Sequence, residues 1–120
     1  MTIETVQRGG HSIAVVHADE PVITDVSSAL DVMMSVRYET GCDRMALPKE
    51  AVTEDFFILS RGLAGEILQK FINYRMKIAI WGDYSRYTSK PLQDFIRESN
   101  RGRDVFFPAD EAAALTALER

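Results

Sequence analysis

Hydrophobic and polar residues alternate along the chain with two different periods, and each change of period marks an expected element. Residues 11–18, HSIAVVHA, are rich in β-branched side chains, which predicts a strand with a largely buried face. In residues 22–41, apolar side chains recur every three or four positions, which predicts a helix. Thr24 or Asp25 would cap the start of that helix, and Gly41 would end it.

The same alternation of strand and helix continues through the second half of the chain. Residues 43–52 predict a short strand, and the longest periodic segment, 53–75, predicts one long helix that begins with acidic residues. Gly62 and Gly65 each cost about 1 kcal/mol relative to alanine inside a helix, so we expect another backbone to approach closely there. A central apolar strand, a third helix, a last strand and a terminal helix are expected over residues 77–82, 89–100, 104–109 and 109–120.

This order predicts one α/β domain over residues 1–120, because the chain is long enough for one continuous core and too short for two. We expect a mixed or mostly parallel sheet of four to five strands, with about four helices packed against it. Residues 1–10 are either a frayed lead-in or the first strand of a hairpin. The hairpin alternative would make the sheet mixed.

Composition narrows the partners that the chain is expected to have. The net charge of −4 argues against nucleic acid, which needs a basic face. No apolar run is long enough to span a bilayer, and residues 1–12 lack the pattern of a secretion signal. The single cysteine, Cys42, fits a reducing compartment. We therefore expect a cytoplasmic protein that binds neither nucleic acid nor membranes.

Two loops carry the residues that are best placed for chemistry. Ligands of α/β sheets gather beyond the carboxyl ends of the strands, where loops lead into helices. The loop that follows the second strand carries Lys49, Glu54 and Asp55, and the loop that follows the central strand is GDYSRYTSKP. We expect these loops to form a site for a small anionic ligand at the start of the third helix, from Glu54, Asp55, Asp83, Ser85, Ser89, Lys90 and Arg101.

Each of these residues also has an ordinary structural interpretation. Ser89 would cap the third helix, and Pro91 lacks the N–H group that the first helical turn leaves without a partner. Asp83 is a common turn residue. Glu54 and Asp55 would complement the dipole of the long helix, and as adjacent helical residues they form a poor catalytic pair. Which interpretation holds depends on whether the two loops lie side by side.

Aromatic residues suggest a second kind of surface. Successive helical positions face about 100° apart, so we expect one of Phe56 and Phe57 to be exposed. Together with Trp81 and Tyr84, an exposed ring would form an interface for a protein partner or a second copy of the chain. Filling of the core is the alternative for all of these side chains.

No arrangement of residues in the sequence predicts catalysis. The histidines and Cys42 do not have metal-ligand spacing, and no nucleophile elbow, phosphate-binding loop or dinucleotide-binding loop is present. We therefore expect no catalytic residues, no metal and no cofactor. The favoured interpretation is a regulatory or protein-binding domain without enzymatic activity, which includes self-association. The alternative is a small-ligand binder or an enzyme with an anion site.

Two segments carry a resemblance to a known family. The segments EAVTEDFFILSRGLAGEILQKFINY and KIAIWGDYSRYTSKPLQDFIRESNRGRDVFFPADEAAAL resemble the bacterial family catalogued as domain of unknown function 4180. GDYSRYTSKPLQDFIRESNRGRDVFF is the most specific part of this resemblance. It covers nearly the whole chain and implies no activity.

The order of elements is more distantly similar to the STAS domain of sulfate-transporter tails and anti-sigma-factor antagonists. Those antagonists are switched by phosphorylation of a serine that directly follows an aspartate at a helix start. Here Asp55 is followed by Phe56, so the match omits the phosphorylated residue. The resemblance implies an α/β fold and the use of the helix after Asp55 to dock another protein.

Overall fold

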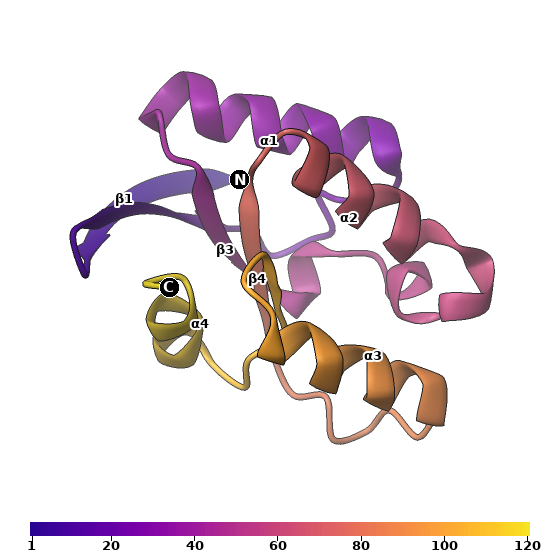
Figure 1. Cartoon of the computed structure of the whole chain (residues 1–120). Helices are drawn as coiled ribbons and strands as arrows, with labels where there is room; N and C mark the ends of the chain where they lie inside the picture. Colours follow the sequence, from indigo (N-terminus) through magenta and orange to yellow (C-terminus); the bar gives the residue numbers. More distant parts are fainter.

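Five strands form one mixed sheet in the computed structural model, which describes residues 1–120. The strands lie in the order β1-β2-β3-β4-β5; β1 runs antiparallel to β2, and all the other neighbours are parallel (Figure 1). Their bounds are β1 (Thr2–Arg8), β2 (His11–His17), β3 (Arg44–Pro48), β4 (Lys77–Trp81) and β5 (Val105–Phe106). The expected mixed α/β sheet is therefore confirmed.

The first ten residues form the hairpin strand and not a frayed lead-in. Arg8 pairs with His11, so the turn consists of Gly9 and Gly10 alone. Their φ angles are 57° and 81°. A two-residue turn with positive φ at both positions matches the right-handed twist of the strands, and glycine adopts it without steric cost.

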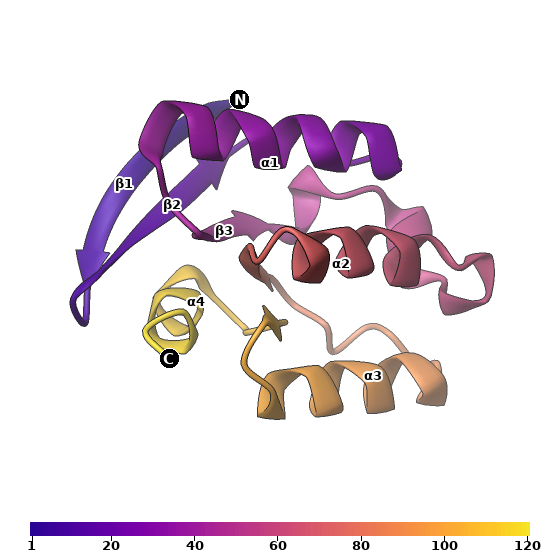
Figure 2. The same cartoon turned by 45° about the horizontal axis from the view of Figure 1, so that its top comes forward.

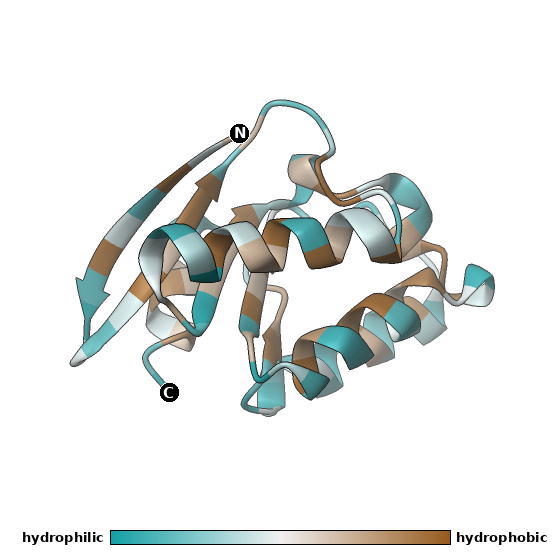
Figure 3. Cartoon of the chain, turned by 90° about the horizontal axis from the view of Figure 1, so that it is seen from above, coloured by the Kyte–Doolittle hydropathy of each residue, from teal (hydrophilic) through white to brown (hydrophobic).

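Four helices pack on the sheet in two unequal layers: α1 (Val26–Thr40), α2 (Leu63–Asn73), α3 (Lys90–Arg101) and α4 (Glu111–Ala117). The first three cover one face over a core of 24 buried residues, and α4 covers the other face over a cluster of 6 (Figure 2). Hydrophobic and hydrophilic residues are interspersed along the helices (Figure 3), as expected where one face of a helix packs on the sheet and the other faces solvent. No helix is both long enough and apolar enough to cross a membrane.

Strand β4 lies between β3 and β5 and is buried on both faces, as its apolar sequence predicts. Ile78 and Ile80 point into the larger core, whereas Ala79 packs in the smaller cluster under α4. Ala46, the neighbour of Ala79 on β3, lies on the same face, so two small side chains lie side by side there. Two alanines side by side let the short helix α4 approach the sheet closely.

The local signals at the helix ends are confirmed. The Asp25 carboxylate accepts a hydrogen bond from the Ser28 N–H at 2.7 Å, and the Ser28 hydroxyl completes a reciprocal capping box at the start of α1. Gly41 ends α1 with φ 70°. Ser89 caps α3 by accepting a bond from the Leu92 N–H at 3.4 Å.

The single long helix expected over residues 53–75 is wrong at its beginning. Residues 54–57 and 59–61 form short 3₁₀ turns, and α2 starts only at Leu63. Gly62, with φ 77°, lies in the left-handed region and cannot continue a right-handed helix. The break also lets both Phe56 and Phe57 turn inward, which a continuous helix would prevent. Asp55 therefore does not lie at the start of a long helix.

The expected close approach of another backbone to Gly62 and Gly65 is also wrong. A Cβ atom added at either glycine meets no atom within 4 Å. Gly62 is needed for its positive φ, because β-carbon sterics disfavour that conformation. Gly65 lies in the first turn of α2 and has no such need.

We predict that the two glycines respond to alanine with opposite signs. Gly65→Ala should raise the free energy of unfolding by about 0.5–1 kcal/mol, because alanine is the better helix former and the added methyl group meets open space. Gly62→Ala should lower it by about 1 kcal/mol through left-handed strain alone. Urea denaturation of the two variants measures both changes. Effects of the same sign would contradict the assigned end of the helix.

Candidate functional site

The carboxyl ends of β3 and β4 bring the two loops of interest together. Pro48 and Trp81 are the last paired residues of these parallel neighbours, so Lys49 and Gly82 follow them side by side. A Cβ atom on Gly82 would lie 2.8 Å from the Lys49 Cβ, which is closer than carbon atoms can pack. Gly82 therefore gives the Lys49 stem room to cross the end of β4.

Lys49 ends in a three-residue polar bridge between the loops. Its ammonium group donates to the Tyr87 hydroxyl at 3.2 Å, and Tyr87 donates to the Glu54 carboxylate at 3.0 Å. The same ammonium lies 3.6 Å from Glu54 and 5.1 Å from the centre of the Tyr87 ring. The hydroxyl thus accepts one bond and donates another, and it holds the loop of β3 against the loop of β4.

Electrostatics in this bridge favour ordinary charge states at neutral pH. Burial raises the pKa of Tyr87, and the carboxylate of Glu54 adds to this, while the bond from Lys49 opposes it. For Lys49, burial works against the charged form, but Tyr87, Glu54 and Glu50 outweigh it and the pKa is raised. Tyr87 is therefore a neutral phenol and Lys49 a cation near pH 7.

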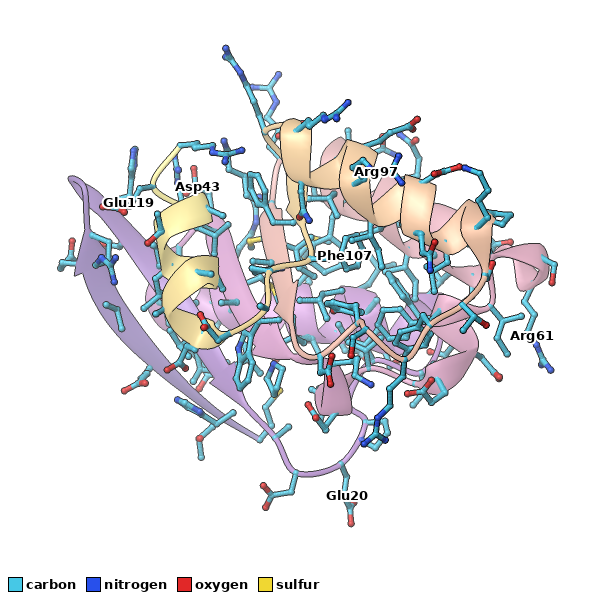
Figure 4. All side chains as sticks on the ribbon, turned by 90° about the horizontal axis from the view of Figure 1, so that it is seen from below. Glu20, Asp43, Arg61, Arg97, Phe107 and Glu119 are labelled. Atoms are coloured by element: carbon cyan, nitrogen blue, oxygen red, sulfur yellow. The ribbon has the colours of Figure 1, made fainter.

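An aromatic cluster lies directly beneath the bridge. The Phe57 ring centre lies 5.4 Å from that of Tyr87 and 5.7 Å from that of Tyr84, and Phe107 lies 5.8 Å from Tyr84. Figure 4 shows Phe107 in the middle of the molecule, between α3 and the sheet. The Tyr84 hydroxyl donates to the Ile80 carbonyl at 2.6 Å, and burial raises its pKa strongly. These rings support the loops from within.

The aromatic residues expected at an interface do not share one exposed surface. Phe56 and Phe57 are 1% and 4% exposed, so the expectation that one ring faces solvent is wrong. The 3₁₀ turn places the two rings edge to face, with centres 5.0 Å apart, inside the core. Trp81 packs in the cluster under α4, on the opposite face of the sheet from Tyr84.

A pocket of about 420 Å³ opens between the two loops. One wall comes from residues 54–60 and the other from residues 86–92. Its floor and sides combine apolar groups with hydroxyl and charged groups: Glu54, Phe57, Ile58, Leu59, Ser60, Arg86, Tyr87, Thr88, Ser89, Pro91 and Leu92. The volume lies in the range of pockets that hold small molecules.

Two of the predicted site residues, Glu54 and Ser89, line this pocket. Asp83 and Ser85 lie in the same loop but face a separate hollow, bounded by Ile96 and Phe107. The Asp83 carboxylate accepts bonds from both the backbone N–H and the hydroxyl of Ser85, which lower its pKa. This pair forms the turn that the structural interpretation predicted for Asp83.

The other three predicted residues do not line the pocket. Asp55 pairs with Arg61 at 3.5 Å, and Lys90 pairs with Asp94, one turn along α3, at 2.9 Å. Arg101 lies at the opposite end of α3, about 16 Å from Lys90 at the helical rise per residue. Placing Arg101 in a common site with Ser89 was therefore wrong.

The anion site expected at the start of α3 is poorly equipped. Of the first three helical residues, Pro91 has no N–H group, and the N–H of Leu92 bonds to Ser89. Only the N–H of Lys90 is left, and its ammonium group is held by Asp94. The helix dipole alone is worth about half a charge. The start of α3 is a capped helix end, and the pocket beside it is the better candidate site.

Lys49 and Tyr87 form the bridge between the loops but were not among the predicted site residues, although Lys49 was noted in the loop after the second strand. Both residues belong to loops that follow the carboxyl ends of strands, and the order of the elements predicted where these loops lie. Their contact joins residues 38 apart in the sequence, and no local pattern encodes it. No group of three or more acidic, histidine or cysteine side chains is placed to hold a metal ion, and Cys42 is buried.

We predict that the buried phenols make stability fall at high pH. The pKa values of Tyr84 and Tyr87 are raised in the folded state. Their contribution to the free energy of unfolding is therefore complete below the unfolded-state pKa of about 10, and it is lost as the pH rises through the folded-state pKa values. Tyr84→Phe should flatten this loss, measured by urea denaturation across the alkaline range. Tyr38→Phe, which removes an exposed phenol, is the control. If the free energy of unfolding fell equally steeply with pH in both variants, burial of Tyr84 would be contradicted.

Comparison with known proteins gives a family for this chain. No curated protein and no solved structure matches it, so the similarity to the STAS fold stays a prediction. One family model, described as a domain of unknown function, matches residues 8–118 and so spans all the elements from β2 to α4 and both loops of the site. The chain belongs to the DUF4180 family.

Proposed function

We propose that this protein is a binding domain without catalytic activity that holds a small ligand in the pocket between residues 54–60 and 86–92. The observation that carries the proposal is the convergence of two strand-end loops on a pocket of about 420 Å³. Strand ends of this kind are where α/β sheets bind their ligands. The polar bridge through Tyr87 holds the two walls at a fixed separation.

The lining supports a ligand with an apolar body. Phe57, Ile58, Leu59, Pro91 and Leu92 contribute carbon surface to the pocket. Ile58 is 43% exposed, so its side chain is free to add apolar contact surface to a bound ligand. Burial of apolar surface is the main source of affinity in such a pocket.

The charges support one acidic group on the ligand. Glu54 is already paired with Lys49 and accepts a bond from Tyr87, so its charge is largely balanced. Arg86 lines the same pocket and takes part in none of the ion pairs of the chain. The hydroxyl groups of Ser60 and Thr88 also line it. A carboxylate beside Arg86 would gain a charge-assisted hydrogen bond.

The pKa directions support binding over catalysis. A general acid or base works best with a pKa close to the working pH. The pKa values of both Tyr87 and Lys49 are shifted upward, away from neutrality. Lys49 is also held by its neighbours and is not free to attack a substrate.

Docking of a protein partner is a second candidate, and the outer face of α1 favours it. Tyr38 is 93% exposed, and Met34, one turn earlier, is 42% exposed. Large apolar side chains that share one helix face and lie open to solvent are typical of interaction surfaces. A partner that binds there would be retained when the pocket is filled, which separates the two candidates.

We predict that a bulky side chain at the mouth of the pocket abolishes ligand binding. Octanoate is the probe, because it combines an alkyl chain with a carboxylate, and NMR amide shifts report where it binds. Ser60→Phe should remove the shifts around residues 54–60 and 86–92, whereas Ser27→Phe, on the exposed side of α1, should keep them. Arg86→Gln should weaken octanoate and leave octanamide unchanged.

Two results would contradict the proposal. One is the absence of any octanoate or octanamide shift at the pocket in the wild-type protein. The other is equal binding by the Ser60→Phe and Ser27→Phe proteins, which would place the probe elsewhere. A bound ligand should also raise stability by RT ln(1 + [L]/Kd), which is about 2.7 kcal/mol at a hundredfold excess over Kd.

A further inference from the structure

Four cationic side chains gather near the amino-terminal ends of β4 and β5, whereas the pocket described above lies at the carboxyl ends of β3 and β4. Lys77 begins β4, Arg101 ends α3, Arg103 lies in the loop before β5, and Arg120 follows α4. With Gly102 they line a hollow of about 420 Å³ that has no acidic and no apolar residue in its lining. Such a gathering is unexpected in a chain whose net charge is −4.

Two of these cations are held in place by backbone oxygens. The Arg120 guanidinium donates to the carbonyl groups of Asn100 and Gly102 at 3.1 and 3.3 Å, and it lies 5.2 Å from the centre of the Phe106 ring. Half-buried Lys77 donates to the Arg120 backbone oxygen at 3.4 Å. The carbonyl oxygens of Asn100 and Gly102 are neutral, so they orient Arg120 without cancelling its charge.

Arg101 and Arg103 are exposed, and neither belongs to any of the ion pairs of the chain. No acid forms an ion pair with either arginine. Asp43 pairs with Arg44, Glu119 pairs with Arg8, and exposed Asp104 forms no ion pair. The negative C-terminal end of the α3 dipole offsets only about half a positive charge. A clear excess of positive charge is left in the hollow.

We propose that this hollow binds a small anion that carries two or more phosphoryl groups. Guanidinium groups donate paired hydrogen bonds that match phosphoryl oxygens, and ammonium adds a compact charge. Lys77 and Arg120 form the preformed base of the site, and Arg101 and Arg103 close on the anion from the rim. The volume suits a diphosphate with an attached group.

Charge outside the hollow selects a small anion over a nucleic acid. Removing the four cations from the count leaves the remainder of the chain at −8, that is −4 minus 4. A long polyanion would be repelled by this remainder, because nucleic-acid binding needs an extended basic face. A compact diphosphate meets only the basic hollow.

Isothermal titration calorimetry with inorganic pyrophosphate tests the site. In low-salt buffer, the Arg101→Gln/Arg103→Gln double variant should bind pyrophosphate at least about tenfold more weakly than the wild type. The Arg61→Gln/Arg97→Gln double variant loses the same charge from two other exposed arginines (Figure 4) and should bind like the wild type. All four positions are exposed, so both proteins should fold.

The outcomes are distinct. The proposal is supported if only the Arg101→Gln/Arg103→Gln variant loses affinity for pyrophosphate and the wild type binds pyrophosphate more tightly than inorganic phosphate. Equal weakening in both double variants would reduce the effect to overall charge and overturn the proposal. So would the absence of pyrophosphate binding by the wild type, or tighter binding of a single-stranded oligonucleotide than of pyrophosphate.

Discussion

The Lys49 side chain is the contact on which the candidate site depends. It crosses Gly82 at the carboxyl end of β4, where a β-carbon would lie 2.8 Å from its own Cβ, and ends at Tyr87. Through Tyr87 it reaches Glu54, so one lysine links the loop of its own strand to the loop of the next. The pocket exists because these loops are held together without closing on each other.

The rest of the architecture makes this contact possible. Parallel pairing of β3 with β4 aligns their ends, and the core beneath α1, α2 and α3 supplies the rings on which the loops rest. Phe57 is the common neighbour, because its ring meets Tyr84, Tyr87 and Phe107. The 3₁₀ turn that buries Phe57 also carries Glu54, so the irregular segment before α2 positions the site.

Local signals predicted the caps of α1 and α3 and the strand-end loops, because a cap involves residues three apart and the order of elements sets where strands end. They did not predict the break at Gly62, where periodicity continues while the backbone turns left-handed. Arg101 was misplaced because nearness in sequence hides the length of the intervening helix. The partners of Lys49 depend on tertiary packing, which no window of sequence contains.

A double-mutant cycle between Lys49 and Tyr87 tests this account most directly. Lys49→Met keeps an unbranched stem over Gly82 and removes the ammonium group, while Tyr87→Phe removes only the hydroxyl. Urea denaturation of the two single variants and the double variant gives their coupling free energy. We expect about 1 kcal/mol of favourable coupling, as for a hydrogen bond to a charged group that is partly exposed. Additive effects, within about 0.3 kcal/mol, would contradict a Lys49–Tyr87 bridge between the loops.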